Sequence, residues 1–140
     1  MQLKILYEDN HIIAVNKQSG HIVQGDETGD KPLSEWVKDY IKEKYEKPGD
    51  VFLGVVHRID RPVSGIVLFA RTSKSLSRLN ELFKTKAIQK TYWAVVKNKP
   101  KKEEGTIVHY HQKDEKQRKA KLFDKEVAHS KKCVLHYKLL

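Results

Sequence analysis

The start of the chain alternates apolar and polar residues in short stretches that are typical of β-strands. Residues 3–7 carry such a pattern, residues 11–16 form a second, mostly apolar run, and the turn-forming pair Asp9 and Asn10 separates them. Residues 21–24 form a further short apolar run, which follows Ser19 and Gly20. These three runs predict an antiparallel meander of three strands.

Two stretches show the spacing of amphipathic helices instead. The first begins after Pro32, which suits the first turn of a helix, and ends near residues 47–49. Its inner face carries Leu33, Trp36, Val37, Tyr40, Ile41 and Tyr45. The second helix is predicted to be capped by Thr72 or Ser73. Its inner face carries Leu76, Leu79, Leu82 and Phe83.

Two nearly continuous apolar runs, residues 51–56 and 65–70, predict strands that are covered on both faces. Later strands are predicted at residues 91–96, 106–110 and 133–139. The fold class predicted is therefore α+β, with a mixed, mainly antiparallel sheet and flanking helices in one domain, 1–140. The last predicted strand is followed by no turn or cap, so we interpret the chain as a fragment truncated at its C-terminus.

Composition narrows the class of protein. Hydrophobic residues make up 39% of the chain, which is enough for a packed core. No apolar run is long enough to span a bilayer, and the start of the chain does not have the pattern of a signal peptide. The single cysteine, Cys133, fits a reducing compartment, so we expect a cytoplasmic protein. The 28 Lys and Arg against 18 Asp and Glu give a net charge of +10, which favours polyanions such as RNA as partners.

Asp60 is the strongest candidate for chemistry. It lies in a charged loop, residues 57–64, between two apolar strands, and Arg58 and Arg61 flank it. Nearby positive charge favours the ionised carboxylate, which can act as a nucleophile or a general base. The same arginines can bind phosphate. The alternative is that these charges form an exposed ion pair that only organises the loop.

The histidines offer a second alternative. His109 and His111 lie two residues apart in a predicted strand, so both side chains would point to one face. With His57 or His136 they could bind zinc. Seven histidines in a basic chain make such a spacing unsurprising, and no cysteine lies near His109 and His111 in the sequence. A metal-dependent hydrolase that uses Asp60 and these histidines is therefore kept as a lesser hypothesis.

The residues around Asp60 also resemble a known family. Residues 57–71 read His-Arg-Ile-Asp-Arg-Pro-Val-Ser-Gly-Ile-Val-Leu-Phe-Ala-Arg, which resembles the signature of the RluA family of RNA pseudouridine synthases. That signature is His-Arg-Leu-Asp-x-x-Thr-Ser-Gly followed by an apolar strand. Ile59 replaces its Leu and Val63 its Thr.

Other segments resemble the same family. Residues 5–17 are similar to its opening strands and Asn-Lys-Pro motif, with Gln18 in place of the proline. Residues 90–96 are similar to its Lys-x-Tyr-x-Ala strand. The last family motif, a Gly-Arg-x-His-Gln-Ile-Arg-like stretch whose arginine pairs with the catalytic aspartate, has no counterpart here. We therefore expect the 140-residue chain by itself to be inactive or poorly active.

The resemblance implies a pseudouridine synthase-like fold and the isomerisation of uridine to pseudouridine in structured rRNA or tRNA. It implies that Asp60 is the catalytic aspartate, that Arg58 fills the space left by a flipped uridine, and that Tyr92 packs on the target base. Arg61 and His57 complete the predicted RNA-binding set. No cofactor or metal is expected, and whether Asp60 attacks the base or the sugar stays open. The alternative function is a non-catalytic basic RNA-binding module.

Overall fold

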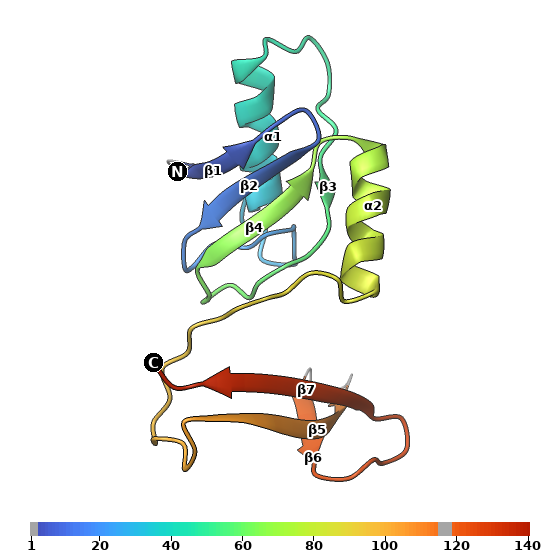
Figure 1. Cartoon of the computed structure of the whole chain (residues 1–140). Coiled ribbons are helices and arrows are strands. Elements are labelled where there is room, and N and C mark those ends of the chain that lie inside the picture. Colours follow the sequence, from blue (N-terminus) through green and yellow to red (C-terminus); the bar gives the residue numbers. More distant parts are fainter. Residues whose placement is uncertain (1–2, 115–118) are drawn as a thin grey trace. The chain divides into compact units, whose positions relative to one another are not determined.

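The computed structural model describes residues 3–114 and 119–140, and the chain forms two compact units, Met1–Thr91 and Tyr92–Leu140 (Figure 1). The first unit contains β1 (Ile5–Glu8), β2 (Ile12–Lys17), α1 (Leu33–Lys44), β3 (Gly54–Val55), β4 (Gly65–Ala70) and α2 (Ser73–Lys84). The second contains β5 (Glu104–Asp114), β6 (Lys119–Phe123) and β7 (Lys131–Lys138). The α+β class is confirmed. That both units belong to one catalytic domain stays a prediction.

The first unit is built on an antiparallel sheet with the strand order β1–β2–β4–β3. Its centre is the β2–β4 ladder, which runs from the pair Ile12 and Ala70 to the pair Lys17 and Gly65. The core comprises Ile13 and Val15 of β2, Val67 and Phe69 of β4, Leu33, Val37 and Ile41 of α1, and Val23. Because side chains alternate along a strand, these β2 and β4 residues present one apolar face to α1.

The start of α1 explains why residues 21–24 do not form the predicted strand. The carbonyl oxygen of Ile22 accepts a hydrogen bond from the Leu33 N–H at 2.8 Å, and that of Val23 accepts from the Ser34 N–H at 3.1 Å. The first N–H groups of a helix lack partners inside the helix, and this segment supplies them. Ile22 and Val23 are buried, so their apolar character reflects packing. The prediction of a third meander strand was wrong.

The strand and helix that follow differ in detail from the sequence prediction. Residues 51–56 contribute only the two-residue strand β3, and most of the run is half-buried. Thr72 caps α2 as predicted, because its side chain accepts a hydrogen bond from the Ser75 N–H at 3.1 Å. Leu82 is 44% exposed and does not lie on the inner face. In the part of the chain that the structure describes, no helix is long and apolar enough to cross a membrane.

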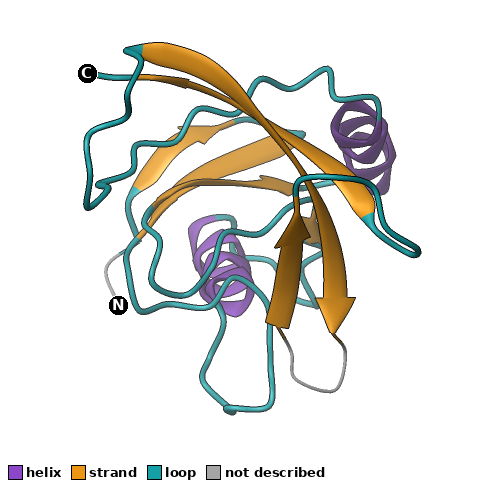
Figure 2. Cartoon of the chain, turned by 90° about the horizontal axis from the view of Figure 1, so that it is seen from below, coloured by secondary structure: helices purple, strands orange, loops and turns teal. Residues whose placement is uncertain are grey.

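The second unit is a three-stranded antiparallel sheet with β5 in the centre. Figure 2 draws the strands of both units in orange. Strand β7 pairs with β5 from Glu104 to His111, and β6 pairs with its other end. The predicted strands at 106–110 and 133–139 are confirmed, whereas β6 was not predicted. The prediction of a strand at residues 91–96 was wrong, because these residues are irregular and exposed. A strand needs a neighbour for its backbone hydrogen bonds, and residues 91–96 pair with no described strand.

Candidate active site

Asp60 lies on an exposed turn between β3 and β4, in residues 57–64, which we call the Asp60 loop. The turn is closed by a hydrogen bond of 3.0 Å from the Val63 N–H to the Asp60 carbonyl oxygen. Gly65 ends the loop with a φ of 142°, a conformation that favours glycine. The Asp60 side chain is exposed, and within the described residues its carboxylate makes no hydrogen bond or ion pair. The carboxylate is therefore free to meet a substrate.

The backbone after Asp60 is held by residues 17–20. The carbonyl oxygen of Arg61 accepts hydrogen bonds from the Lys17 Nζ at 3.1 Å and from the Gly20 N–H at 2.8 Å. The Ser19 Oγ donates to the carbonyl oxygen of Pro62 at 2.8 Å. The Asp60 loop is thus attached to the end of β2 on the side that follows the candidate nucleophile.

Lys17 is the central residue of this attachment. Its side chain is only 1% exposed, and its Nζ also donates to the carbonyl oxygens of Gln18 and His21 at 3.2 and 2.7 Å. Burial lowers the pKa of Lys17, as does the nearby Arg61 charge, while Asp60 opposes both effects. The ammonium group therefore interacts electrostatically with Asp60.

His57 holds the other end of the Asp60 loop. Its Nε2 accepts a hydrogen bond from the Leu68 N–H at 2.9 Å, so this nitrogen carries no proton. The imidazole ring stacks on Phe83, with the ring centroids 5.0 Å apart. Burial, together with the Lys90 charge, lowers the pKa of His57. His57 therefore has a structural role, because its ring attaches the Asp60 loop to β4. A contact of His57 with RNA stays a prediction.

The remaining predicted site residues lie in different surroundings. The Arg61 Nη2 donates to the Asp30 Oδ2 at 2.6 Å and to the Thr28 Oγ1 at 3.1 Å. Arg58 is exposed on the Asp60 loop. Tyr92 is the first residue of the second unit and is 59% exposed. The structure therefore brings four of the five predicted residues onto one loop, and the sequence did not indicate the partners of Arg61.

The histidine hypothesis gains no support from the described part of the chain, in which no group of three or more His, Cys, Asp or Glu side chains could hold a metal ion. The His109 Nε2 lies 3.5 Å from an Asp124 carboxylate oxygen. The His136 Nδ1 lies 2.8 Å from the Thr106 hydroxyl. Within the described residues, each of these two rings thus contacts one polar side chain rather than a ligand set.

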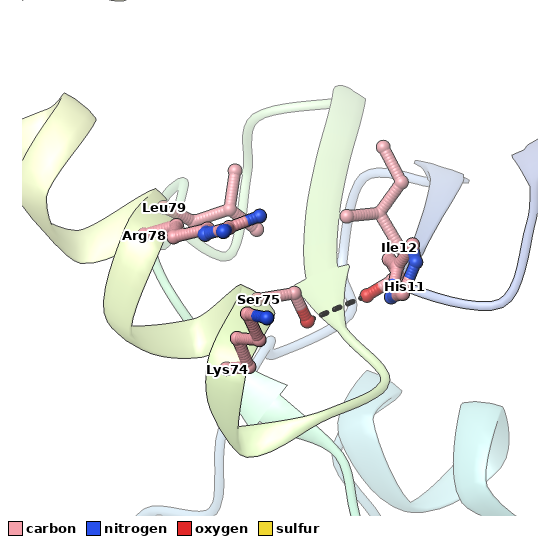
Figure 3. Close-up of a pocket in the computed structure, with 6 residues that line it drawn as sticks. All are labelled: His11, Ile12, Lys74, Ser75, Arg78 and Leu79. Carbon is pink, nitrogen blue, oxygen red and sulfur yellow. Dashed lines mark hydrogen bonds between the residues drawn. The ribbon is translucent and has the colours of Figure 1, made fainter.

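A hollow of about 290 Å³ lies at the His11 end of β2, which is the opposite end from Lys17. It is lined by His11, Ile12, Lys74, Ser75, Arg78 and Leu79 (Figure 3). The Ser75 Oγ donates to the carbonyl oxygen of His11 at 2.7 Å, which fixes the first turn of α2 beside it. The hollow contains no carboxylate, so the Asp60 loop remains the candidate active site.

Comparison with known proteins identifies the class. The sequence model of the family described as RNA pseudouridylate synthase matches residues 11–140, and the chain belongs to this family. The resemblance to RluA-type enzymes predicted from the sequence is confirmed. The chain is 35% identical over 136 residues to a ribosomal large subunit pseudouridine synthase C of Rickettsia bellii. It is 32% identical over 138 residues to a tRNA pseudouridine synthase C of Vibrio cholerae.

A solved structure, that of human RNA Pseudouridylate Synthase Domain Containing 4, shares the fold with a TM-score of 0.77 at 20% sequence identity. The match covers 96% of this chain and 52% of the human chain. The chain likewise spans 43% of the Rickettsia relative and 54% of the Vibrio relative. It therefore corresponds to about half the length of the proteins it matches.

Proposed function

We propose that the protein converts uridine to pseudouridine in structured RNA, with Asp60 as the nucleophile. The observation that carries the proposal is the exposed Asp60 carboxylate on a loop attached to β2 through Lys17 and Ser19 and to β4 through His57. A carboxylate on a held loop that makes no hydrogen bond or ion pair within the described residues is suited to attack a bound nucleoside. Membership of the pseudouridylate synthase family supplies the reaction class.

The proposed reaction is an isomerisation. Asp60 adds covalently to the uridine, the bond between C1′ and N1 breaks, and the base rotates. A bond between C1′ and C5 then forms, C5 loses its proton, N1 gains one, and Asp60 is released. No atoms or electrons are gained or lost overall, so the proposed chemistry requires no metal or redox cofactor.

The proposed roles of the other residues follow from what uridine in folded RNA requires. The target base must leave its stack before it can be reached. In the proposal Arg58 occupies the vacated space and Tyr92 stacks on the base, as aromatic side chains do on unstacked bases. The charge of +10 favours the RNA backbone. We propose rRNA or tRNA as the substrate, since the relatives are named for one or the other, and a cytoplasmic location.

The test is tritium release from RNA that carries 5-tritiated uridine, with the full-length protein beside its Asp60→Ala variant. We expect the variant to release no tritium while it still binds RNA in a fluorescence anisotropy assay. Asp39→Ala is the matched control, because Asp39 is an exposed aspartate on α1, 58% exposed and paired with Lys31. Release that persists in Asp60→Ala would refute the assignment. Binding without release by the wild-type protein would favour a non-catalytic RNA-binding module.

A further inference from the structure

Arg61 has a set of partners that no sequence motif indicated. We call Arg61, Asp30, Thr28 and Asp26 the Arg61 cluster. Two acceptors from the loop before α1, Asp30 and Thr28, converge on the Arg61 Nη2. Asp26 in turn accepts a hydrogen bond of 2.9 Å from the Thr28 N–H. The loop is thus folded on itself in a shape that presents two oxygens to one guanidinium nitrogen.

Glycine makes this arrangement possible. Gly29 has a φ of 74°, a backbone conformation that glycine adopts without strain. It lies between Thr28 and Asp30 and turns the chain so that both side chains face the same nitrogen. The two oxygens bind the side chain of Arg61, while Lys17 and Gly20 bind its carbonyl oxygen. The residue that follows Asp60 is therefore held at both its backbone and its side chain.

We propose that Asp30, together with Thr28, is a positioning residue for the reaction, which acts on Asp60 through Arg61. This inference rests on the proposed function of Asp60. With Arg61 held at two points, the adjacent Asp60 samples fewer orientations, and a reacting group that is pre-oriented gains rate without gaining affinity. Residues 26–30 then support the active site through Arg61.

The proposal competes with the prediction from the sequence that Arg61 binds RNA phosphate. The two interpretations of Arg61 predict different effects of removing the Asp30 side chain on RNA binding and on kcat. If Arg61 were a phosphate ligand, Asp30 would compete with the RNA, and Asp30→Ala would tighten binding and steepen its salt dependence. If Asp30 positions Asp60, the same variant lowers kcat and leaves RNA binding unchanged.

The expected loss is moderate. The side chains of Arg61 and Asp30 are 41% and 59% exposed, and an exposed ion pair stabilises a single conformation only weakly. We expect Asp30→Ala to reduce kcat about fivefold, which corresponds to about 1 kcal/mol at 1.36 kcal/mol per factor of ten. Asp30→Asn keeps an amide oxygen as acceptor and should retain more activity than Asp30→Ala.

The experiment measures kcat, KM and RNA affinity by tritium release and anisotropy for full-length wild-type protein, Asp30→Ala, Arg61→Ala and the double variant. Asp39→Ala is the control, since its ion pair with Lys31 is equally exposed. Either single variant should lower kcat without changing KM, and the double variant should lose no more than Arg61→Ala does. Tighter RNA binding by Asp30→Ala, or a kcat equal to that of the control, would overturn the proposal.

A second measurement does not depend on activity. Hydrogen exchange of the Gly20 and Val63 amides reports on the Asp60 loop, because they donate to the carbonyl oxygens of Arg61 and Asp60. Both amides should exchange faster in Asp30→Ala than in Asp39→Ala. If wild-type protein releases no tritium, the proposed function fails, and unchanged exchange would then also reject the positioning by Asp30.

Discussion

Replacement of Glu8 by glutamine should destabilise the first unit far more than loss of an ordinary surface ion pair. The Glu8 side chain is 9% exposed and lies 3.1 Å from the Arg71 Nη1, and the Arg71 side chain is 10% exposed. The same carboxylate accepts hydrogen bonds from Lys44 at 2.8 Å, Tyr45 at 2.7 Å and Tyr40 at 2.9 Å. This partly buried cluster joins β1, the end of α1 and the residue after β4.

The magnitude follows from the burial of Arg71. Removing one partner of a buried ion pair costs about 3–5 kcal/mol. Arg71 keeps its hydrogen bonds to the Asp9 carbonyl oxygen and the Tyr45 hydroxyl, which offset part of this cost. Glutamine keeps one oxygen that can accept from a tyrosine, so we expect about 3 kcal/mol, the lower end of that range. In a unit of this size that loss lowers Tm by roughly 12–24 °C.

The assay is urea and thermal unfolding followed by the fluorescence of Trp36, in a Trp93→Phe background. Trp93 is 86% exposed and lies in the second unit, so its removal leaves a probe of the first unit alone. Glu81→Gln is the matched control, because Glu81 forms a 3.8 Å pair with Lys84 in which both side chains are exposed. The control should change stability by less than about 0.5 kcal/mol.

The effect of pH gives the reasoning a second test. Burial alone would raise the pKa of Glu8, but hydrogen bonds from Lys44, Tyr45 and Tyr40 outweigh it and hold the pKa below its ordinary value of 4.5. A carboxyl whose pKa is lowered by folding stabilises the folded state above the unfolded pKa, and loses this effect as the pH falls through the folded pKa. The gap between wild type and Glu8→Gln should therefore narrow below pH 4.5. A gap no larger than that of the control, or one independent of pH, would refute the account.

Three further predictions concern the Asp60 loop and α2. Lys17→Met should cost about 1–3 kcal/mol in urea unfolding, because three carbonyl oxygens lose the Lys17 ammonium as a donor. A change below about 0.5 kcal/mol would contradict the role of this ammonium in holding the loop. In an NMR pH titration, the pKa of the His57 imidazole should lie below its ordinary value of 6.5. Lys90→Gln should move the titration midpoint upward, because it removes a nearby positive charge. A midpoint above 6.5 would contradict the hydrogen bond from the Leu68 N–H. Thr72→Ala should destabilise the first unit by about 1 kcal/mol, because α2 loses its cap, whereas Thr72→Ser keeps the capping hydroxyl and should not. Thermal unfolding followed by circular dichroism measures both variants.

The parts of the fold predicted from the sequence are those in which local pattern and tertiary packing agree. Val67, Phe69 and Ala70 of the apolar run in β4 are buried, and Thr72 caps α2 as its residue type suggests. Ile66 is 63% exposed, so β4 is not covered on both faces as the run predicted. Residues 21–24 and 91–96 have strand-like composition but lack a neighbouring strand within the described residues. Whether a β-branched run becomes a strand depends on a partner, and that partner cannot be identified from the run itself.

The candidate site likewise contains residues that the sequence predicted and contacts that it did not. The motif around Asp60 was recognisable because its residues are contiguous, whereas the contact between Arg61 and Asp30 joins polar residues 31 positions apart. Lys17 left a weak signal, since it continues the every-second-residue pattern of Ile13 and Val15, which are fully buried. A lysine in such a position is usually exposed. Its burial became evident only when the three carbonyl oxygens around its Nζ were known.

The β2–β4 ladder has a consequence for the order of folding. It joins strands that are separated in the sequence by α1, and the hydrogen bond from Lys17 to Arg61 closes a span of 44 residues. Closing such a span costs chain entropy before any contact compensates for it, so pairings of this kind form later than local turns and helices. We expect the nucleophile to acquire its geometry among the last events of refolding. During refolding, protection of the Gly20 amide from exchange should then appear later than helical circular dichroism, and simultaneous appearance would show that the loop and the helices form together.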